Sequence, residues 1–304
     1  MRVKSRAKLG ATAVVLLAIL LVFASCPAAA VEHDSGETWV YEVSTKIDVG
    51  AFVVDVEGDI TYEFKDESSI TLGTNEFDVN ALSVDGDLSG TMDLFGSEFL
   101  EVNATIDGFL FEAVDGCGTV EENVSWLVDA TIGTDTGTWS VQSVVQTVVT
   151  YAPPYMSEFD PSSIELGASW SEYVIVESVI TTWENGTVKG VSTDRSNMVY
   201  SIVVDSAKET VATPAGEFDA IGITVTDQDG NCETRWWSEE VNGWVKIQYY
   251  SVGDDDPVET MVLSSHIRGN SGSMLLVVVV GVAFTLFACA VLAIVVLQIR
   301  RSKV

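Results

Sequence analysis

The period-two alternation of apolar and polar residues most constrains this chain, and it is clearest in the stretch from 213 to 251. Ile221, Ile223 and Val225 alternate there with smaller or polar residues, which places one face of an extended segment in a core. Three signals that favour tight turns separate the apolar runs: Pro214-Ala215-Gly216, Asp229-Gly230 and Asn242-Gly243. The stretch is therefore predicted to form a three-stranded β-meander.

The same alternation extends from about residue 37 to residue 266, and no part of this range has a sustained 3.6-residue apolar period with helix caps. Short strands are expected at 37–48, 52–56, 60–64 and 77–84. Two of the turns between them are expected at acidic, glycine-containing tripeptides: Glu57-Gly58-Asp59 and Asp85-Gly86-Asp87. This part of the chain is predicted to be nearly all β.

An internal repeat divides the alternating region into two halves. Its first anchor, G-x-[ST]-W-x-x-x-V, begins at Gly36 and again at Gly167. Its second anchor, E-F-D followed by an apolar triplet, begins at Glu76 and again at Glu217. We therefore expect a duplicated antiparallel meander, with units at 31–155 and 156–268 that form a curved sheet, a half-barrel or a sandwich. Chance recurrence of short β motifs is the alternative.

The two ends of the chain predict its location. Four basic residues precede an apolar run at 11–23, and Ala28-Ala29-Ala30 provides the small residues of a signal-peptidase site, so cleavage of a signal peptide (1–30) is expected before Val31. The alternative is a lipobox at 23–26, which would lipidate Cys26. A second, uncharged apolar run at 274–299 can span roughly 30 Å of hydrocarbon as a helix.

The basic residues Arg300, Arg301 and Lys303 follow that second run directly and are expected to stay in the cytoplasm. The chain is thus predicted to be a single-pass type I protein of the cell membrane. A tether (269–273) would join the exported part to the helix, and residues 300–304 would form the cytoplasmic tail.

Charge is unevenly distributed along the chain. All 45 acidic residues lie between positions 31 and 270, whereas only eight of the 15 basic residues do, so the exported part has a net charge of −37. Such a field repels nucleic acid and anionic lipid headgroups, which excludes a nucleic-acid partner. It favours divalent cations, cationic partners or a saline medium. The alternative is that the charge only keeps a surface protein hydrated.

A resemblance to a known family appears at residues 165–250 and also at 36–86. The motifs that carry it occur in a fixed order: Gly167-x-x-Trp170, Pro214-Ala215-Gly216-x-Phe218, Trp236-Trp237-Ser238 and Gly243-x-Val245-Lys246. This order resembles exported half-barrel β proteins of the LolA and LppX class, which carry apolar ligands. The resemblance implies a curved β-sheet with an apolar concave face. Trp237 stands where that pattern prefers Tyr, and no segment matches the helices that line a lipid carrier's cavity.

Candidate site residues are few. Trp236, Trp237 and Trp244 are the candidate ligand-binding residues, although aromatic residues of small β domains mostly pack in the core. Because Trp236 and Trp237 are adjacent in a strand, they are expected on opposite faces. Asp227, Asp229 and Asn231 resemble the start of a calcium loop but lack its closing bidentate acid, so an acidic hairpin turn is the simpler interpretation.

No catalytic constellation is expected. His33 and His266 are the only histidines, and neither stands in a context typical of a hydrolytic triad. The prediction is a binding module for an unknown extracellular ligand or envelope partner, without a cofactor other than a weakly indicated calcium ion. The alternatives are a structural, glycosylated envelope protein and, less favoured, a surface hydrolase. Asn103, Asn123 and Asn185 begin glycosylation sequons.

Two of the four cysteines, Cys117 and Cys232, lie in the exported part outside the predicted signal and membrane helix, and such a pair typically forms a disulfide outside the cell. A loop of that length would stabilise the fold by about 4–5 kcal/mol in the chain-entropy model. We predict that peptide mapping of the mature protein finds Cys117 linked to Cys232 before reduction and separated after it. Two alkylatable thiols in the unreduced protein would contradict the bond.

Overall fold

The computed structural model describes residues 33, 35–49, 52–94, 98–114, 118–134, 137–161 and 163–269. The predicted signal peptide with Cys26, the transmembrane helix and the cytoplasmic tail lie outside the described residues, as does Cys117. Within the described ranges, no helix has the length and hydrophobicity that crossing a bilayer requires.

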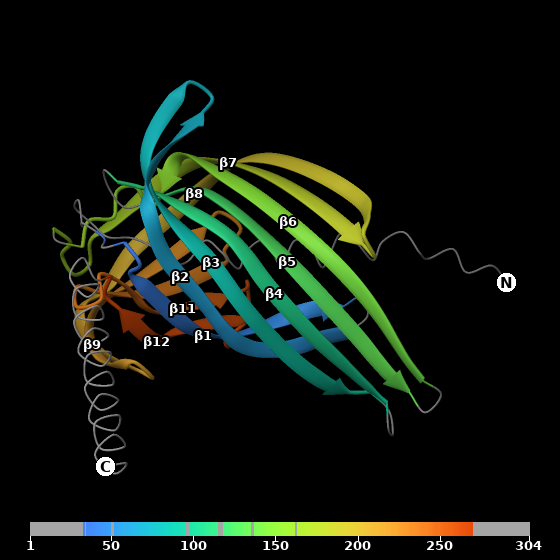
Figure 1. The fold of residues 1–304 in the computed structure, drawn as a ribbon. Helices are drawn as coiled ribbons and strands as arrows, with labels where there is room; N and C mark the ends of the chain where they lie inside the picture. The colour runs from blue at the N-terminus through green and yellow to red at the C-terminus, as the bar shows by residue number, and fades with distance from the viewer. Residues whose placement is uncertain are drawn as a thin grey trace, which may run out of the picture.

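The described residues form twelve antiparallel strands that close into one barrel (Figure 1). Each strand pairs with its neighbours in the chain, and the first strand pairs with the last. The strands are β1 (Thr38–Val49), β2 (Phe52–Leu72), β3 (Asn75–Asp93), β4 (Phe99–Ala113), β5 (Thr119–Thr134), β6 (Gly137–Tyr155), β7 (Ser169–Glu184), β8 (Thr187–Thr213), β9 (Gly216–Asp227), β10 (Cys232–Ser238), β11 (Gly243–Tyr250) and β12 (Glu259–Ile267).

The expectation of an all-β meander is confirmed, but the half-barrel and the sandwich are wrong because the sheet closes completely. β1 pairs with β12 from Thr38 opposite Ile267 to Ser44 opposite Thr260, with one register shift. The same strand pairs with β2 along its whole length. Every strand therefore has a partner on both sides, which removes the exposed edges that an open sheet would present.

The two repeat anchors occupy equivalent strands in the two halves of the barrel. The first anchor opens β1 at Trp39 and β7 at Trp170, and the second lies near the start of β3 at Phe77 and of β9 at Phe218. The predicted boundary near residue 155 thus separates six strands from six. The two halves share one closed sheet, and their origin by duplication stays a prediction.

The strands are longer than predicted, since the turns expected at 57–59 and 85–87 do not exist. Gly58 lies inside β2 and pairs with Leu88, and Gly86 lies inside β3 and pairs with Ile60. A Cβ atom added at Gly58 would lie 2.0 Å from the carbonyl oxygen of Asp87. These glycines therefore mark a close approach of neighbouring strands in a strongly curved sheet rather than chain reversals.

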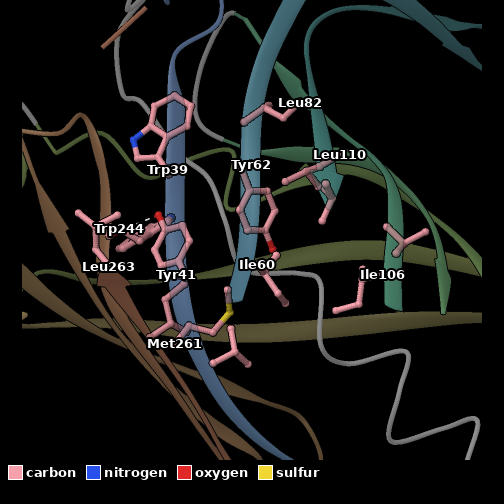
Figure 2. Packing of buried hydrophobic residues seen from close by; sticks show 14 of the residues in the cluster. Trp39, Tyr41, Ile60, Tyr62, Leu82, Ile106, Leu110, Trp244, Met261 and Leu263 are labelled. Carbon is pink, nitrogen blue, oxygen red and sulfur yellow. Dashed lines mark hydrogen bonds between the residues drawn. The ribbon is translucent and has the colours of Figure 1, made fainter. Parts of the chain in front are cut away.

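The interior is wide and is filled by aliphatic side chains together with tyrosine, tryptophan and phenylalanine rings. A barrel of twelve strands encloses more space than the eight-stranded barrels that side chains just fill. Figure 2 shows Tyr41 of β1 and Tyr62 of β2 in this core; their rings meet edge to face with centroids 5.7 Å apart. The Tyr41 hydroxyl donates a hydrogen bond of 2.8 Å to the carbonyl oxygen of Trp244, which ties β1 to β11 across the interior.

The connection between β6 and β7 also contributes to the core. We call residues 156–168, of which 162 is not described, the β6–β7 plug. Met156 and Phe159 of the plug are buried, and the Phe159 ring stacks on Trp244 with centroids 5.3 Å apart. The carboxylate of Glu172 accepts hydrogen bonds from the backbone N–H groups of Met156 (2.7 Å) and Glu158 (3.1 Å), so this buried acid holds the plug in place.

The close approach at Gly58 yields a stability prediction. Gly58→Ala forces a methyl group against the Asp87 carbonyl, and we expect a loss of about 1–3 kcal/mol, the usual effect of overpacking. The matched control is Gly190→Ala in β8, where an added Cβ meets no atom within 4 Å. The control should leave stability unchanged or slightly increased. Urea unfolding followed by tryptophan fluorescence measures both, and equal midpoints for the two variants would contradict this account of the curvature.

Candidate functional site

Charged side chains gather inside the barrel, where apolar ones would suffice for packing. We define the interior acidic cluster as Glu112 of β4, Glu122 of β5, Glu233 and Arg235 of β10, and Glu259 of β12. All five are at most 6% exposed. Burying a charge without a partner is strongly unfavourable, so four carboxyl groups beside one guanidinium need an explanation.

Strand alternation determines that these side chains point inward. Glu112 shares the parity of the buried Leu110 on β4, and Glu122 shares that of the buried Val124 on β5. Arg235 lies on β10 in phase with the buried Trp237. Because successive residues of a strand face opposite sides, each charge occupies a position that its strand otherwise fills with an apolar residue.

Arg235 pairs with one of the four carboxyl groups. Its Nε donates a hydrogen bond to Glu233 Oε1. Its guanidinium lies 5.4 Å from the ring centroid of Tyr155 and 5.3 Å from that of Trp244. The guanidinium of Arg235 is therefore a buried cation that is bonded to a carboxylate and lies near two aromatic rings.

The other three carboxyl groups have no cation of their own among the described residues. Burial raises the pKa of Glu112 to about 8, against the opposing charge of Arg235. Burial also raises the pKa of Glu122 to about 8, although this carboxyl accepts a 2.8 Å hydrogen bond from Tyr151. The pKa of Glu259 is likewise raised, by burial and then by the charge of Glu233. Near neutral pH, Glu112 and Glu122 are thus close to the point where they gain or lose protons.

The buried polar atoms that lack a hydrogen-bond partner include Glu112 Oε1 and the hydroxyl of Tyr62, and also the indole Nε1 of Trp244, whose ring lies beside Arg235. Tyr62 is completely buried, and its pKa is raised first by burial and then by Tyr41, Glu122, Glu259 and Glu112. The hydroxyl therefore lies in the field of the cluster. Unpaired buried polar atoms are rare in folded proteins and often mark a place where a ligand supplies the missing partner.

A second polar arrangement lies at the closing strands. His33 Nδ1 and His266 Nε2 each lie 2.9 Å from one oxygen of Glu37. Burial alone would raise the pKa of Glu37, but hydrogen bonds and charges from His266 and His33 lower it to about 2. The Trp39 ring stacks on His266 with centroids 5.5 Å apart.

This His–Glu–His arrangement joins the segment before β1 to the end of β12. In the described part of the chain, the hydrogen bonds of both imidazoles go to Glu37, and no serine, threonine or cysteine side chain is bonded to either ring. The sequence did not predict that the two histidines share a carboxylate. The geometry fits a clasp across the seam of the barrel better than a nucleophile–base pair.

The predicted ligand-binding tryptophans divide between the two sides of the sheet. Trp237 and Trp244 are buried, whereas Trp236 faces outward, where Lys246 Nζ lies 4.9 Å from its ring centroid. The ring of Trp244 lies beside a member of the interior acidic cluster, with the guanidinium of Arg235 5.3 Å from its centroid.

The predicted calcium residues form a hydrogen-bonded turn. Asp227 Oδ1 accepts hydrogen bonds from the backbone N–H groups of Asp229 and Asn231, both at 2.9 Å, and Oδ2 accepts one from the Asn231 amide at 2.8 Å. Glu233, the nearest further acid, points into the barrel toward Arg235 instead. Among the described residues, no group of three or more metal-ligating side chains is arranged to hold an ion.

The remaining predicted residues lie apart from the cluster. Asn103 and Asn185 are exposed and Asn123 is half-buried on the outward face of β5. Cys232 is half-buried at the start of β10 and forms no disulfide with a described residue. Because Cys117 lies outside the described residues, the disulfide between Cys117 and Cys232 stays a prediction.

Comparison of the chain with protein-family models, with curated proteins and with solved structures gave no match. The site is therefore interpreted from its own geometry.

Sequence reasoning missed the interior acidic cluster because acidic residues are abundant in this chain. The signal that was available is the phase of each acid within its strand: Glu112 and Glu259 fall on the apolar parity, whereas Asp107 falls on the polar one. Recognising this signal requires the strand boundaries, and the bulges between strands shift the phase at several places.

The raised pKa values predict an unusual dependence of stability on pH. Between the ordinary pKa of 4.5 and about 8, the folded state keeps protons on Glu112 and Glu122 that the unfolded state has lost. Stability should therefore fall as pH rises through this window, by roughly 1.4 kcal/mol per pH unit for each group. Glu37 acts in the opposite direction: its contribution is complete above pH 4.5 and is lost as pH falls toward 2. Maximum stability is expected near pH 5.

Urea unfolding at pH 5 to 8.5 measures this slope. Glu112→Gln should reduce the slope, because it removes one of the linked protons while those on Glu122 and Glu259 remain. Asp107→Asn, an exposed residue on the same strand, is the matched control and should leave it unchanged. A stability that rises or stays constant from pH 5 to 8 in the parent protein would contradict the assignment.

Proposed function

We propose that this chain is a membrane-anchored cell-surface module that binds a small ligand inside its barrel. The observation that carries the proposal is the interior acidic cluster with its unpartnered groups, Glu112 Oε1 and the Tyr62 hydroxyl. A barrel that served only as a scaffold would be more stable with apolar residues at these positions. Buried groups with strongly shifted pKa values concentrate at binding and catalytic sites.

The β6–β7 plug offers the route by which a ligand reaches the interior. Phe159 of the plug stacks on the Trp244 ring, and the guanidinium of Arg235 lies 5.3 Å from the centroid of the same ring. Glu172, which also accepts a 3.1 Å hydrogen bond from Trp170, is bonded to the start of the plug, and Gly167 and Ala168 at its end are bonded to Val204 of β8. Movement of the plug near Phe159 would require release of the two hydrogen bonds to Glu172, while the pairing between strands stays in place.

The proposed location rests on the predicted signal peptide and membrane helix, which would place the acidic barrel outside the cell. The resemblance to LolA-like carriers supports a ligand within a curved β-sheet, although the charged interior favours a ligand that is not purely apolar. No catalytic role is proposed, because the candidate site combines carboxyl groups and aromatic rings without an identified nucleophile.

A structural envelope role is the second candidate. It is favoured by the exported charge of −37 and by the three sequons, whose asparagines Asn103, Asn123 and Asn185 all lie on the outer side of the barrel or at a hairpin turn. Such a role would not require the interior acidic cluster.

A co-purification experiment separates these two roles. The full chain is purified in nanodiscs as the parent protein, as Glu112→Gln and as Asp107→Asn, and small molecules in denatured extracts are compared by mass spectrometry. We expect at least one compound to accompany the parent and Asp107→Asn in near-stoichiometric amount and to fall severalfold with Glu112→Gln. Extracts that contain no compound above the empty-nanodisc background would contradict the binding function and favour the envelope role.

A further inference from the structure

We infer that the ligand of the barrel is a compact organic cation: a protonated amine, or a related ammonium or amidine group, attached to a small apolar body. This inference rests on the proposed function and specifies the chemical class that the same site selects. Its basis is the balance of charge and hydrogen-bonding groups in the interior acidic cluster.

The charge balance excludes an anionic ligand. Arg235 is the only lysine or arginine among the buried described residues, and Glu233 already pairs with it. The guanidinium also lies near Tyr155 and Trp244, which restricts further access. A carboxylate or phosphate placed beside Glu112, Glu122 and Glu259 would meet acidic groups, and the neutral donors of Tyr62 and Trp244 carry no charge to offset the repulsion.

The unpartnered acceptors of the interior favour a ligand that carries hydrogen-bond donors over a neutral apolar ligand. Glu112 Oε1 is an acceptor when ionised, and the Tyr62 hydroxyl can also accept a hydrogen bond. An ammonium group would supply donors to these two buried atoms and compensate the charge that burial disfavours. A purely apolar ligand would leave both atoms unpaired and would gain nothing from the carboxyl groups.

The aromatic surroundings suit the same ligand. Arg235 shows the arrangement within this interior, since its guanidinium is bonded to a carboxylate and lies near two aromatic rings. Tyr41, Tyr62 and Trp244 offer comparable rings near the unpartnered atoms, as Figure 2 shows for their relative positions. Cations bind over such rings more strongly when both are removed from water.

A bare metal ion fits the site less well. A divalent ion needs several oxygen ligands that converge at 2.0–2.6 Å, and no set of three or more such residues converges among the described residues. The carboxyl groups come from four different strands and influence one another electrostatically without sharing a coordination centre. An organic cation, which is larger and needs only one or two acceptors, matches this spacing.

Three probes that differ only in their polar group test the inference: 3-phenylpropylamine, 3-phenylpropanol and 3-phenylpropionate. Binding to the full chain in nanodiscs is measured by isothermal titration calorimetry at pH 7.5 in 0.5 M NaCl. The salt screens attraction to the acidic outer surface much more than attraction to a buried site. We expect the amine to bind at least ten times more tightly than the alcohol, and the carboxylate not to bind.

Variants then locate the binding. Glu112→Gln should weaken amine binding at least tenfold, and Tyr62→Phe should weaken it severalfold, whereas Asp107→Asn should leave it unchanged. Tyr62→Phe is a sharp test, because a hydroxyl without a partner contributes nothing to the fold and its removal should not reduce stability.

Equal affinity for the amine and the alcohol would overturn the inference that the ligand is an organic cation. Amine binding that Glu112→Gln leaves unchanged would overturn it as well. Failure of all three probes would also overturn it. The co-purification experiment decides separately whether the binding function survives, since a neutral or anionic compound found there would retain the function and reject only the cation.

Discussion

The pairing of β1 with β12 is the constraint on which the rest of this structure depends. It converts a twelve-stranded meander, which would otherwise expose two long edges, into a closed barrel whose backbone groups are satisfied by neighbouring strands. Glu37 is hydrogen-bonded to His33 and to His266 of β12, which reinforces the seam. Trp39 of β1 donates a 3.0 Å hydrogen bond to the carbonyl oxygen of Val241 in the turn between β10 and β11. The first and last strands are thereby fixed to each other.

Closure determines what the interior has to contain. A wide ring of strands leaves space that small aliphatic residues alone would not fill, and this chain fills it with tyrosine and tryptophan rings and with the β6–β7 plug. Curvature is permitted where glycine lets neighbouring strands approach, as at Gly58 and Gly108. The same wide interior accommodates the charged residues, whose desolvation would be hard to tolerate in a thin, tightly packed core.

The site and the stability of the barrel are therefore linked. The carboxyl groups of Glu112 and Glu122 destabilise the fold wherever they ionise, and a cation that binds beside them would relieve this effect. Selection for packing alone would not retain such residues. Their burial beside Arg235, with one carboxyl oxygen and one tyrosine hydroxyl left unpaired, is why the interior rather than the acidic outer surface is the stronger candidate site.

The sequence by itself determined the β class and the three turns of residues 213–251, because period-two alternation and turn residues act locally. It also assigned Trp236 and Trp237 to opposite faces, which the structure confirms. Tertiary structure alone decided that Gly58 and Gly86 lie within strands, that the sheet closes, and that His33 and His266 meet at Glu37. These outcomes depend on pairing between distant residues, and the inward direction of Glu112 depends on a strand phase that bulges alter. A local pattern does not encode such long-range register, which is why the candidate site became visible only in the folded barrel.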